Sequence, residues 1–166
     1  MTGVLAQINR SNGGLPKLAV PSPVMLHPDG VEADRHRNLN LHGGPNKAVL
    51  MIAAEFVDSL IARGFPVFYG ALGENLTVSG FDPHQWRAGQ RYRLGADAVI
   101  ELTTLRTPCF NLDVYGPPIK SELYDGQCKS GDVGSPHWAH GGFYARVIHP
   151  GLLFHGAPII LETDVA

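Results

Sequence analysis

Cysteine is scarce in this sequence, whose 166 residues include only Cys109 and Cys128. Two cysteines are too few to hold an iron–sulfur cluster, and they do not complete a regular structural zinc pattern. The N-terminus also lacks a basic segment followed by an apolar stretch, which is the pattern of a secretory signal. We therefore expect a cytoplasmic protein in which both thiols are free.

An excess of charge of either sign is lacking too. Thirteen Lys and Arg residues stand against fifteen Asp and Glu residues, for a formal net charge of −2. This balance gives no basic surface for nucleic acid, so any anion-binding surface must be local. The longest apolar stretch, around 48–54, is far too short to span a bilayer. We expect neither nucleic acid nor a membrane as a partner.

Several catalytic glycine patterns are missing as well. There is no G-x-S-x-G turn to present a serine nucleophile, and no Walker or Rossmann glycine pattern to hold a nucleotide. These absences argue against a serine hydrolase and against the common nucleotide-binding folds.

Glycine and proline are abundant, with 20 and 13 residues, which is too many for a helical bundle. They separate short segments that have strand composition. One helix is predicted from Ala48 to Arg63, where apolar residues recur at helical spacing before Gly64. The predicted strands are Val4–Asn9, Leu76–Val78, Arg91–Leu94, Val99–Leu105, Tyr144–Ile148 and Pro158–Glu162. Short strands around an internal helix predict one mainly β domain over residues 1–166, a β-barrel with a few helices.

The stretch Val114–Gly142 is rich in glycine, proline and polar residues. It is predicted to be a long loop over one end of the barrel, with a short helix near Ile119–Tyr124. Its aromatic residues Tyr115, Tyr124 and Trp138 could form a stacking wall for a flat polar heterocycle.

Cys109 is the residue with the most informative surroundings. Pro108 stiffens the backbone before it, and Arg106 is close enough in sequence to face the thiol if the chain turns back. One interpretation is a thiolate that binds a soft metal or attacks a substrate. The other is a buried structural cysteine. Cys128 lacks comparable neighbours and is interpreted as incidental.

The segment His42-Gly43-Gly44-Pro45-Asn46-Lys47 precedes the predicted helix. Adjacent glycines let a backbone approach a ligand closely. The first-turn N–H groups of the helix, together with Lys47, would then suit a phosphate. The alternative is an ordinary turn that enters a helix.

Two further clusters allow two interpretations each. The amide of Asn75 in Gly73-Glu74-Asn75 could read the edge of a heterocycle, or the three residues could form an Asx-turn at the start of a strand. The run Asp34-Arg35-His36-Arg37 is either a solvated surface cluster or part of an anion site.

Taken in order, these motifs resemble the MOSC domain family, which is named for the C-terminal domain of molybdenum cofactor sulfurase. The resemblance runs from about Gly30 to Leu161. It is carried by four motifs, His42-Gly43-Gly44-Pro45-Asn46-Lys47-Ala48-Val49, Gly73-Glu74-Asn75-Leu76-Thr77-Val78, Arg106-Thr107-Pro108-Cys109, and Tyr144-Ala145-Arg146-Val147 followed by Pro150-Gly151. The chain departs from the family pattern at Gln90 and Ala157, where an acidic residue often follows glycine, and we expect altered turns there.

The resemblance implies a barrel that binds a molybdenum–pterin cofactor, with Cys109 as the protein ligand of the metal. It further implies a reductase that converts N-hydroxylated compounds, such as hydroxylamino-purines, to amines. Tyr144 would be catalytic, donating a hydrogen bond or a proton to the departing hydroxyl group. The residues implied in cofactor binding are His42, Gly43, Gly44, Asn46, Lys47, Asn75, Arg106 and Arg146.

The implied partners are a small-molecule substrate and an outside electron donor, such as a flavin reductase, and a homodimer is allowed for. Two other functions remain open. The protein could carry cofactor or sulfur through a Cys109 persulfide, or it could be a non-catalytic module that binds the molybdenum–pterin cofactor.

Overall fold

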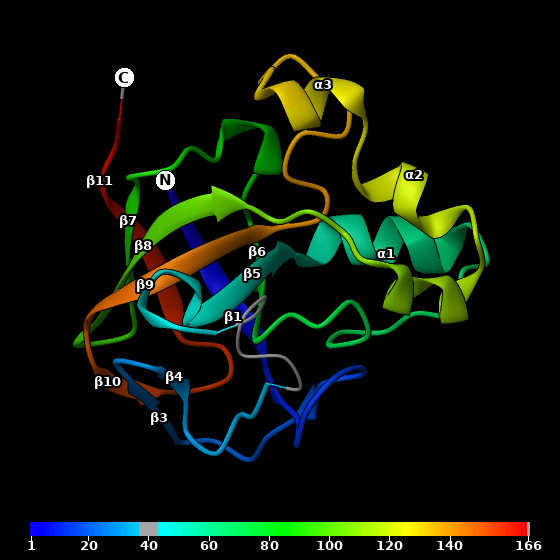
Figure 1. Ribbon diagram of the computed structural model, residues 1–166. Helices are drawn as coiled ribbons and strands as arrows, with labels where there is room; N and C mark the ends of the chain where they lie inside the picture. Colours follow the sequence, from blue (N-terminus) through cyan, green and yellow to red (C-terminus); the bar gives the residue numbers. More distant parts are fainter. Residues whose placement is uncertain (37–42, 166) are drawn as a thin grey trace.

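A ring of β-strands closes into a barrel in the computed structural model, which describes residues 1–36 and 43–165 (Figure 1). The strands follow the order β11-β7-β8-β9-β5-β6-β1, and the pairing of β1 with β11 closes the ring. Neighbours run antiparallel except β5 and β6, which are parallel. The bounds are β1 (Thr2–Arg10), β5 (Val49–Ala53), β6 (Leu76–Ser79), β7 (Arg91–Leu94), β8 (Ala98–Leu105), β9 (Phe143–His149) and β11 (Pro158–Thr163).

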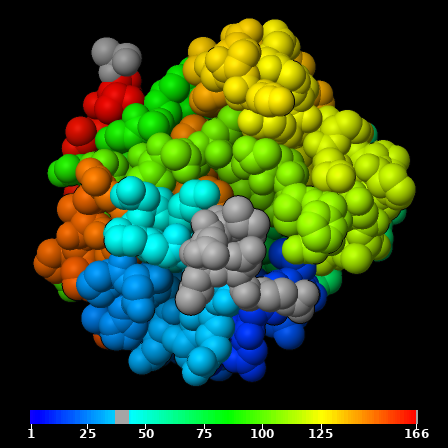
Figure 2. Space-filling model, in the orientation of Figure 1, coloured from blue at the N-terminus to red at the C-terminus, as the bar shows by residue number. Residues whose placement is uncertain are grey.

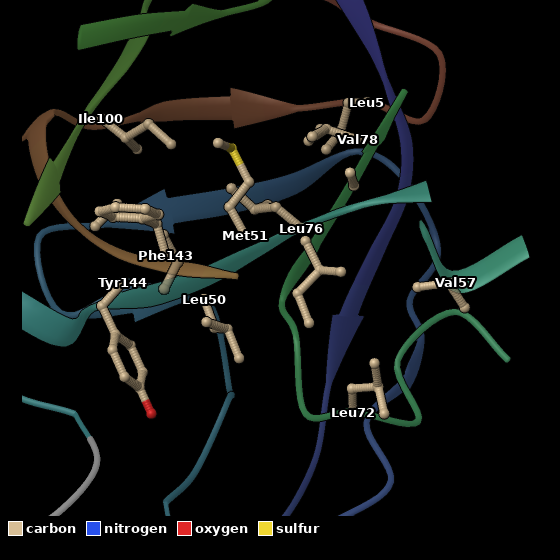
Figure 3. Close-up of a cluster of buried hydrophobic side chains, with 14 of the residues drawn as sticks. Leu5, Leu50, Met51, Val57, Leu72, Leu76, Val78, Ile100, Phe143 and Tyr144 are labelled. Atoms are coloured by element: carbon tan, nitrogen blue, oxygen red, sulfur yellow. The ribbon is translucent and has the colours of Figure 1, made fainter. Parts of the chain in front are cut away.

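Alternating side chains fill the inside of this barrel. Along β8, Ala98, Ile100 and Leu102 are buried and the residues between them are partly exposed, as expected for strands with one face toward a core. Figure 3 shows Phe143 pointing into the apolar cluster with Ile100 and Met51. The mainly β barrel expected from the sequence is confirmed.

The six predicted strands are confirmed, each as part or all of a barrel strand. β7 has the predicted bounds, Arg91–Leu94. Each of the other five strands is one to three residues longer than predicted. The shorter strands were not anticipated. β2 (Leu18–Ala19) pairs with the end of β1, and a small separate sheet contains β3 (Val24–His27), β4 (Gly30–Val31) and β10 (Gly151–Leu153).

The helix predicted from Ala48 to Arg63 is wrong in its first third. Val49–Ala53 form β5, between β6 and β9, and all five residues are buried. The helix α1 occupies only Ala54–Ala62. A short run of consecutive apolar residues fits a buried strand as well as a buried helix, so its periodicity could not separate the two. The predicted stop is correct, since Gly64, with φ +90°, follows the C-cap residue Arg63.

The segment Val114–Gly142 is more ordered than the predicted loop. It contains the predicted short helix as α2 (Ile119–Leu123) and a second helix, α3 (Gly126–Ser130). Both lie with α1 on one side of the barrel in Figure 1. The short 3-10 helices η1 (Pro45–Lys47), η2 (Pro83–Gln85) and η3 (Phe110–Tyr115) complete the structure. No helix among the described residues is long and apolar enough to cross a membrane.

Trp138 does not form the predicted stacking wall. It is buried, its indole N–H donates to the Trp86 carbonyl over 2.9 Å, and its ring packs 6.0 Å from the ring of Phe143. Tyr124 packs against the same core. Tyr115 also packs against this core, and none of the three aromatic residues of the predicted wall lines the main cavity.

The two departures from the family pattern both lie at glycine turns. Gly89 and Gly156 have φ +93° and +79°. Gln90 is buried, accepts from the Tyr92 hydroxyl over 3.0 Å and donates to Asp164 over 2.8 Å. The amide therefore donates to a carboxylate, which an ionised acid at this position could not do.

Candidate functional site

A cavity of about 540 Å³ is lined by segments that are distant in sequence. Figure 2 shows the N-terminal part of the chain in blue and the region around η3 in yellow-green on one face of the molecule. The lining residues are Gly14, Leu15, Lys17, Arg35, His36, Lys47, Leu50, Gly73, Asn75, Arg106, Cys109, Phe110, Asn111 and Tyr144. The cavity therefore combines one thiol with several basic side chains.

Cys109 lies on the cavity wall at the point where the chain leaves β8 and enters η3. It occupies the N-cap position of η3 in an extended conformation (φ −107°, ψ 169°). Its side chain is half-buried and is a free thiol. Cys128 is buried in α3, where its Sγ lies 3.3 Å from the hydroxyl of Ser135, and it is not among the residues that line the cavity. The structure thus brings only the first of the two thiols to the cavity.

Arg106 is buried beside Cys109, and the backbone holds its guanidinium in place. Nη2 donates to the Leu72 carbonyl over 2.9 Å, and the backbone N–H donates to the Gly142 carbonyl over 2.9 Å. The charge is therefore fixed in the wall, which lowers the entropy lost when an anion binds.

Tyr144 extends from β9 toward the cavity, while the adjacent Phe143 points into the core (Figure 3). Burial raises the pKa of the Tyr144 hydroxyl, and the nearby Arg106 guanidinium opposes this rise. Because the ordinary phenol pKa is already about 10, the hydroxyl remains a proton-bearing donor at neutral pH.

Lys47 reaches the same wall from η1, with its Nζ 5.0 Å from the centroid of the Tyr144 ring. This is within the range of a cation–π contact. The predicted helix dipole at this motif is absent, because η1 spans three residues and β5 follows it almost directly. Any anion binding here would rely on the Lys47 charge and not on a helix N-terminus.

Apart from Lys47, the described residues of the glycine motif lie outside the cavity lining. Gly43 and Gly44 have φ +83° and +81°, so they form the turn that the glycines predicted, but neither lines the cavity. The Asn46 side chain is exposed, and its backbone carbonyl accepts from the Thr103 hydroxyl. His42 lies outside the described residues, and so does Arg37.

A second basic wall comes from the N-terminal segment. Lys17 and Asp34 form a buried ion pair with Nζ and Oδ2 2.5 Å apart. Burial lowers the pKa of Lys17, while the Asp34 carboxylate opposes that shift. Arg35 and His36 line the cavity beside this pair, and burial also lowers the pKa of His36. Of the two interpretations of the run 34–37, the described part fits the wall of an anion site.

Lys17 was missed in the sequence analysis. It is one lysine in a short apolar stretch, and only its unusual burial, with 6% of the residue exposed, distinguishes it from a surface lysine. A lysine is rarely buried without a partner, and the partner Asp34 is 17 residues away in sequence, so no local pattern joins them.

Asn75 has a structural role that differs from the predicted contact with a heterocycle. Its Oδ1 accepts from the Leu50 N–H over 3.1 Å, and its Nδ2 donates to Asp34 over 2.9 Å and to the Asn9 carbonyl over 3.2 Å. Both amide protons are therefore in use. Asn75 lines the cavity, but it acts as a clamp between β5, β1 and the N-terminal segment.

Glu74, next to this clamp, is fully buried. Its Oε1 accepts from the Gly70 N–H over 2.7 Å and from the Thr77 hydroxyl over 3.2 Å. Its Oε2 has no hydrogen-bond partner among the described residues. Burial raises the pKa of this carboxyl group, and the charge of Arg106 opposes the rise.

Arg146, which the resemblance implies in cofactor binding, does not line the cavity. Its Nη2 lies 2.6 Å from Oε1 of Glu101, on the exposed surface of the barrel. Glu101 also pairs with Arg91 over 2.6 Å. A surface ion-pair network accounts for the position of Arg146 without a ligand.

Comparison with known families agrees with this arrangement. The family model of the MOSC domain matches residues 38–160. The match covers most of the sequence, and the chain belongs to the MOSC domain family. Lys17, Arg35 and His36 precede the matched residues, so part of the cavity wall lies outside the family match.

The relatives cover nearly the whole chain. Bacillus subtilis (strain 168) YflK is 33% identical over 152 residues, and Escherichia coli (strain K12) YiiM is 30% identical over 155 residues. These matches span 89% and 90% of this chain but 62% and 64% of the relatives, so the chain spans less than two thirds of either. A protein from Gibberella moniliformis named a reductase is 32% identical over 95 residues, which are 55% of this chain and 17% of that protein.

Solved structures share the fold. The crystal structure of YiiM from Geobacillus stearothermophilus matches with a TM-score of 0.68 and 25% identity, covering 97% of this chain and 75% of the other. The YuaD protein from Bacillus subtilis matches with a TM-score of 0.69 over 96% of this chain and 94% of the other. Its 17% identity supports the fold alone.

Proposed function

We propose that this protein binds a molybdenum–pterin cofactor through Cys109 and reduces N-hydroxylated compounds to amines. The observation that carries the proposal is the position of a free thiol on the wall of a cavity whose other walls hold Lys17, Arg35, Lys47 and Arg106. Membership of the MOSC domain family and the similarity to a protein named a reductase support the same function.

The residues present fit such a cofactor. Thiolate is a soft ligand of the kind that binds soft metal centres, and Arg and Lys are the side chains that bind phosphate. The cavity of about 540 Å³ lies in the size range of small-molecule and cofactor sites, which is roughly 300–1,000 Å³. Asp34 already neutralises Lys17, so the net positive charge of the walls comes from the other basic residues.

Each residue has a proposed role in holding the group. Cys109 would bind the metal, and Lys47 and Arg106 would neutralise the anionic complex. Arg35 and the Lys17–Asp34 pair would face the phosphate or the pterin from the N-terminal wall. When bound, the cofactor supplies two-electron redox chemistry, and the protein binds and orients it.

Protons must be supplied as well as electrons. Reduction of a hydroxylamine to an amine and water consumes two electrons and two protons. Tyr144 keeps its proton at neutral pH because its pKa is raised by burial, so it can donate to the departing hydroxyl group. The electrons would come from an outside donor such as a flavin reductase, since two cysteines cannot hold a cluster.

The test compares wild type with Cys109→Ser. Purified protein is assayed for bound molybdenum and pterin, and metal-loaded protein is then assayed for amine release from several N-hydroxylated substrates with a chemical reductant. The proposal expects about one molybdenum per chain and amine release in wild type, with both lost in the variant.

The alternative is a sulfur carrier, which the half-buried position of Cys109 in an open cavity also permits. It predicts cyanide-labile sulfur on Cys109 and no reduction of substrate. Verified molybdenum without amine release above the Cys109→Ser background would end the reductase proposal.

A further inference from the structure

We propose that Phe110 and Asn111 form the element that selects flat, heteroaromatic substrates. The inference rests on the proposed function, since it concerns the substrate class of the same cavity. Both residues line the cavity, and they follow the proposed metal ligand Cys109 directly at the start of η3. Because consecutive Cα atoms are about 3.8 Å apart, a molecule held by these two residues lies next to the thiol.

Phe110 has an unusual exposure for an aromatic residue at a cavity. It is 75% exposed, whereas Tyr144, the other aromatic residue of the lining, is 8% exposed. A phenylalanine left in water loses the free energy that burial would provide. A planar ring stacked on Phe110 would cover that surface, and base–aromatic stacking accepts any flat heterocycle because each has a π-face.

Asn111 offers the polar half of the recognition. Its side chain is exposed at the cavity and makes no hydrogen bond to any described residue, so its carbonyl and its amino group are both available. An asparagine amide presents a donor and an acceptor side by side, which matches the edge of a heterocycle such as a purine. Asn75, to which the sequence analysis assigned this role, has already donated both amide protons.

The other aromatic residues near the site are occupied elsewhere. Trp138, Tyr124 and Tyr115 pack with the core, and the Tyr144 ring is in contact with the Lys47 ammonium group. The stacking role predicted for the segment 114–142 therefore belongs to Phe110, immediately before it.

Val114 provides a matched control. It is also 75% exposed and lies on the same short helix, η3, but it does not line the cavity. If Phe110 acts by general surface hydrophobicity, Val114→Ala and Phe110→Ala should behave alike. If it acts by stacking, only Phe110→Ala should change substrate binding.

The first experiment measures equilibrium binding of adenine, the amine product of a hydroxylamino-purine, to Phe110→Ala, Phe110→Tyr, Val114→Ala and wild type by calorimetry. This readout needs no catalysis. We expect Phe110→Ala to raise Kd about tenfold, which is within the range for loss of one stacked base, and Phe110→Tyr and Val114→Ala to leave it within about twofold. Asn111→Ala should reduce the preference for adenine over purine, which lacks the amino group.

The second experiment measures KM and kcat on molybdenum-loaded protein for a hydroxylamino-purine and for a small aliphatic hydroxylamine. Phe110→Ala should raise KM for the purine alone and leave the aliphatic compound unchanged. Equal effects on both compounds would overturn the inference. An effect that appears with a flavoprotein donor but not with a chemical reductant would also overturn it, and would assign the surface to the donor instead.

The two proposals can fail separately. Binding of adenine that depends on Phe110, without amine release by wild type, would keep this inference and remove the reductase function. Amine release by wild type that is unchanged in Phe110→Ala would keep the reductase function and remove this inference. Absence of adenine binding by wild-type protein overturns the inference directly.

Discussion

The side-chain amide of Asn75 donates a hydrogen bond to the carboxylate of Asp34, with Nδ2 and Oδ2 2.9 Å apart. Asp34 also holds Lys17, so one chain of contacts links the Gly-Glu-Asn motif to the N-terminal basic wall of the cavity. Loss of Asn75 should therefore disturb the barrel and the site together.

For Asn75→Ala, we expect a loss of about 2–4 kcal/mol in the free energy of unfolding, because several buried hydrogen bonds disappear and the Leu50 N–H loses its side-chain acceptor. Urea unfolding measures this value. Asn46→Ala is the control, since its side chain is exposed and only its backbone carbonyl is used. A loss below about 1 kcal/mol for Asn75→Ala would contradict the clamp.

Cys109→Ser should abolish molybdenum binding and leave thermal unfolding within a few degrees of wild type. A serine oxygen is a harder ligand than thiolate, and the Cys109 side chain caps no N–H group of η3. Metal analysis and thermal unfolding check the two parts. Cys128→Ser should retain the metal, because a serine hydroxyl can keep the contact to Ser135. Retention of metal by Cys109→Ser together with its loss in Cys128→Ser would refute the assignment of the ligand.

Lys47→Ala and Arg146→Ala should separate the cavity from the surface network. Lys47 lines the cavity, so its removal should lower the pterin content of purified protein several-fold, measured by fluorescence after release. Arg146 is paired with Glu101 outside the cavity, and an exposed ion pair contributes at most about 1 kcal/mol to stability. Arg146→Ala should keep wild-type pterin content. Equal loss of pterin in both variants would return Arg146 to the site.

Glu74→Gln should flatten the dependence of stability on pH. Burial raises the folded-state pKa of Glu74 above its unfolded value, so the protonated form favours folding. That contribution is full below an unfolded pKa of about 4.3 and is lost as pH rises through the folded-state pKa. A glutamine cannot ionise and can keep the Oε1 contacts.

The measurement is thermal unfolding of both proteins from about pH 4.5 to 8, the range above the unfolded carboxyl pKa. Wild type should lose stability relative to Glu74→Gln as pH rises. If the variant is instead less stable by a margin that grows with pH, Glu74 is a stabilising carboxylate and the assigned direction is wrong.

Local sequence patterns were sufficient to predict much of the fold. β-branched composition between glycine turns predicted β7 with the correct bounds and β8 within one residue, and Gly64 ended α1 as predicted. Those signals depend on neighbours within a few residues. Val49–Ala53 was misassigned because a fully buried strand shows no alternation, and its burial is set by β6, β9 and α1 around it.

The sequence by itself therefore determined the barrel class and the family, and it indicated Cys109 as the candidate metal ligand, because these depend on composition and on short ordered motifs. The tertiary structure alone decided which charges meet the thiol. It left Arg146, two residues after Tyr144, outside the cavity lining, and it added Lys17, which pairs with Asp34 at the same cavity. The physical reason is that strand register and loop packing determine which way a side chain faces, and these depend on contacts between residues far apart in the chain.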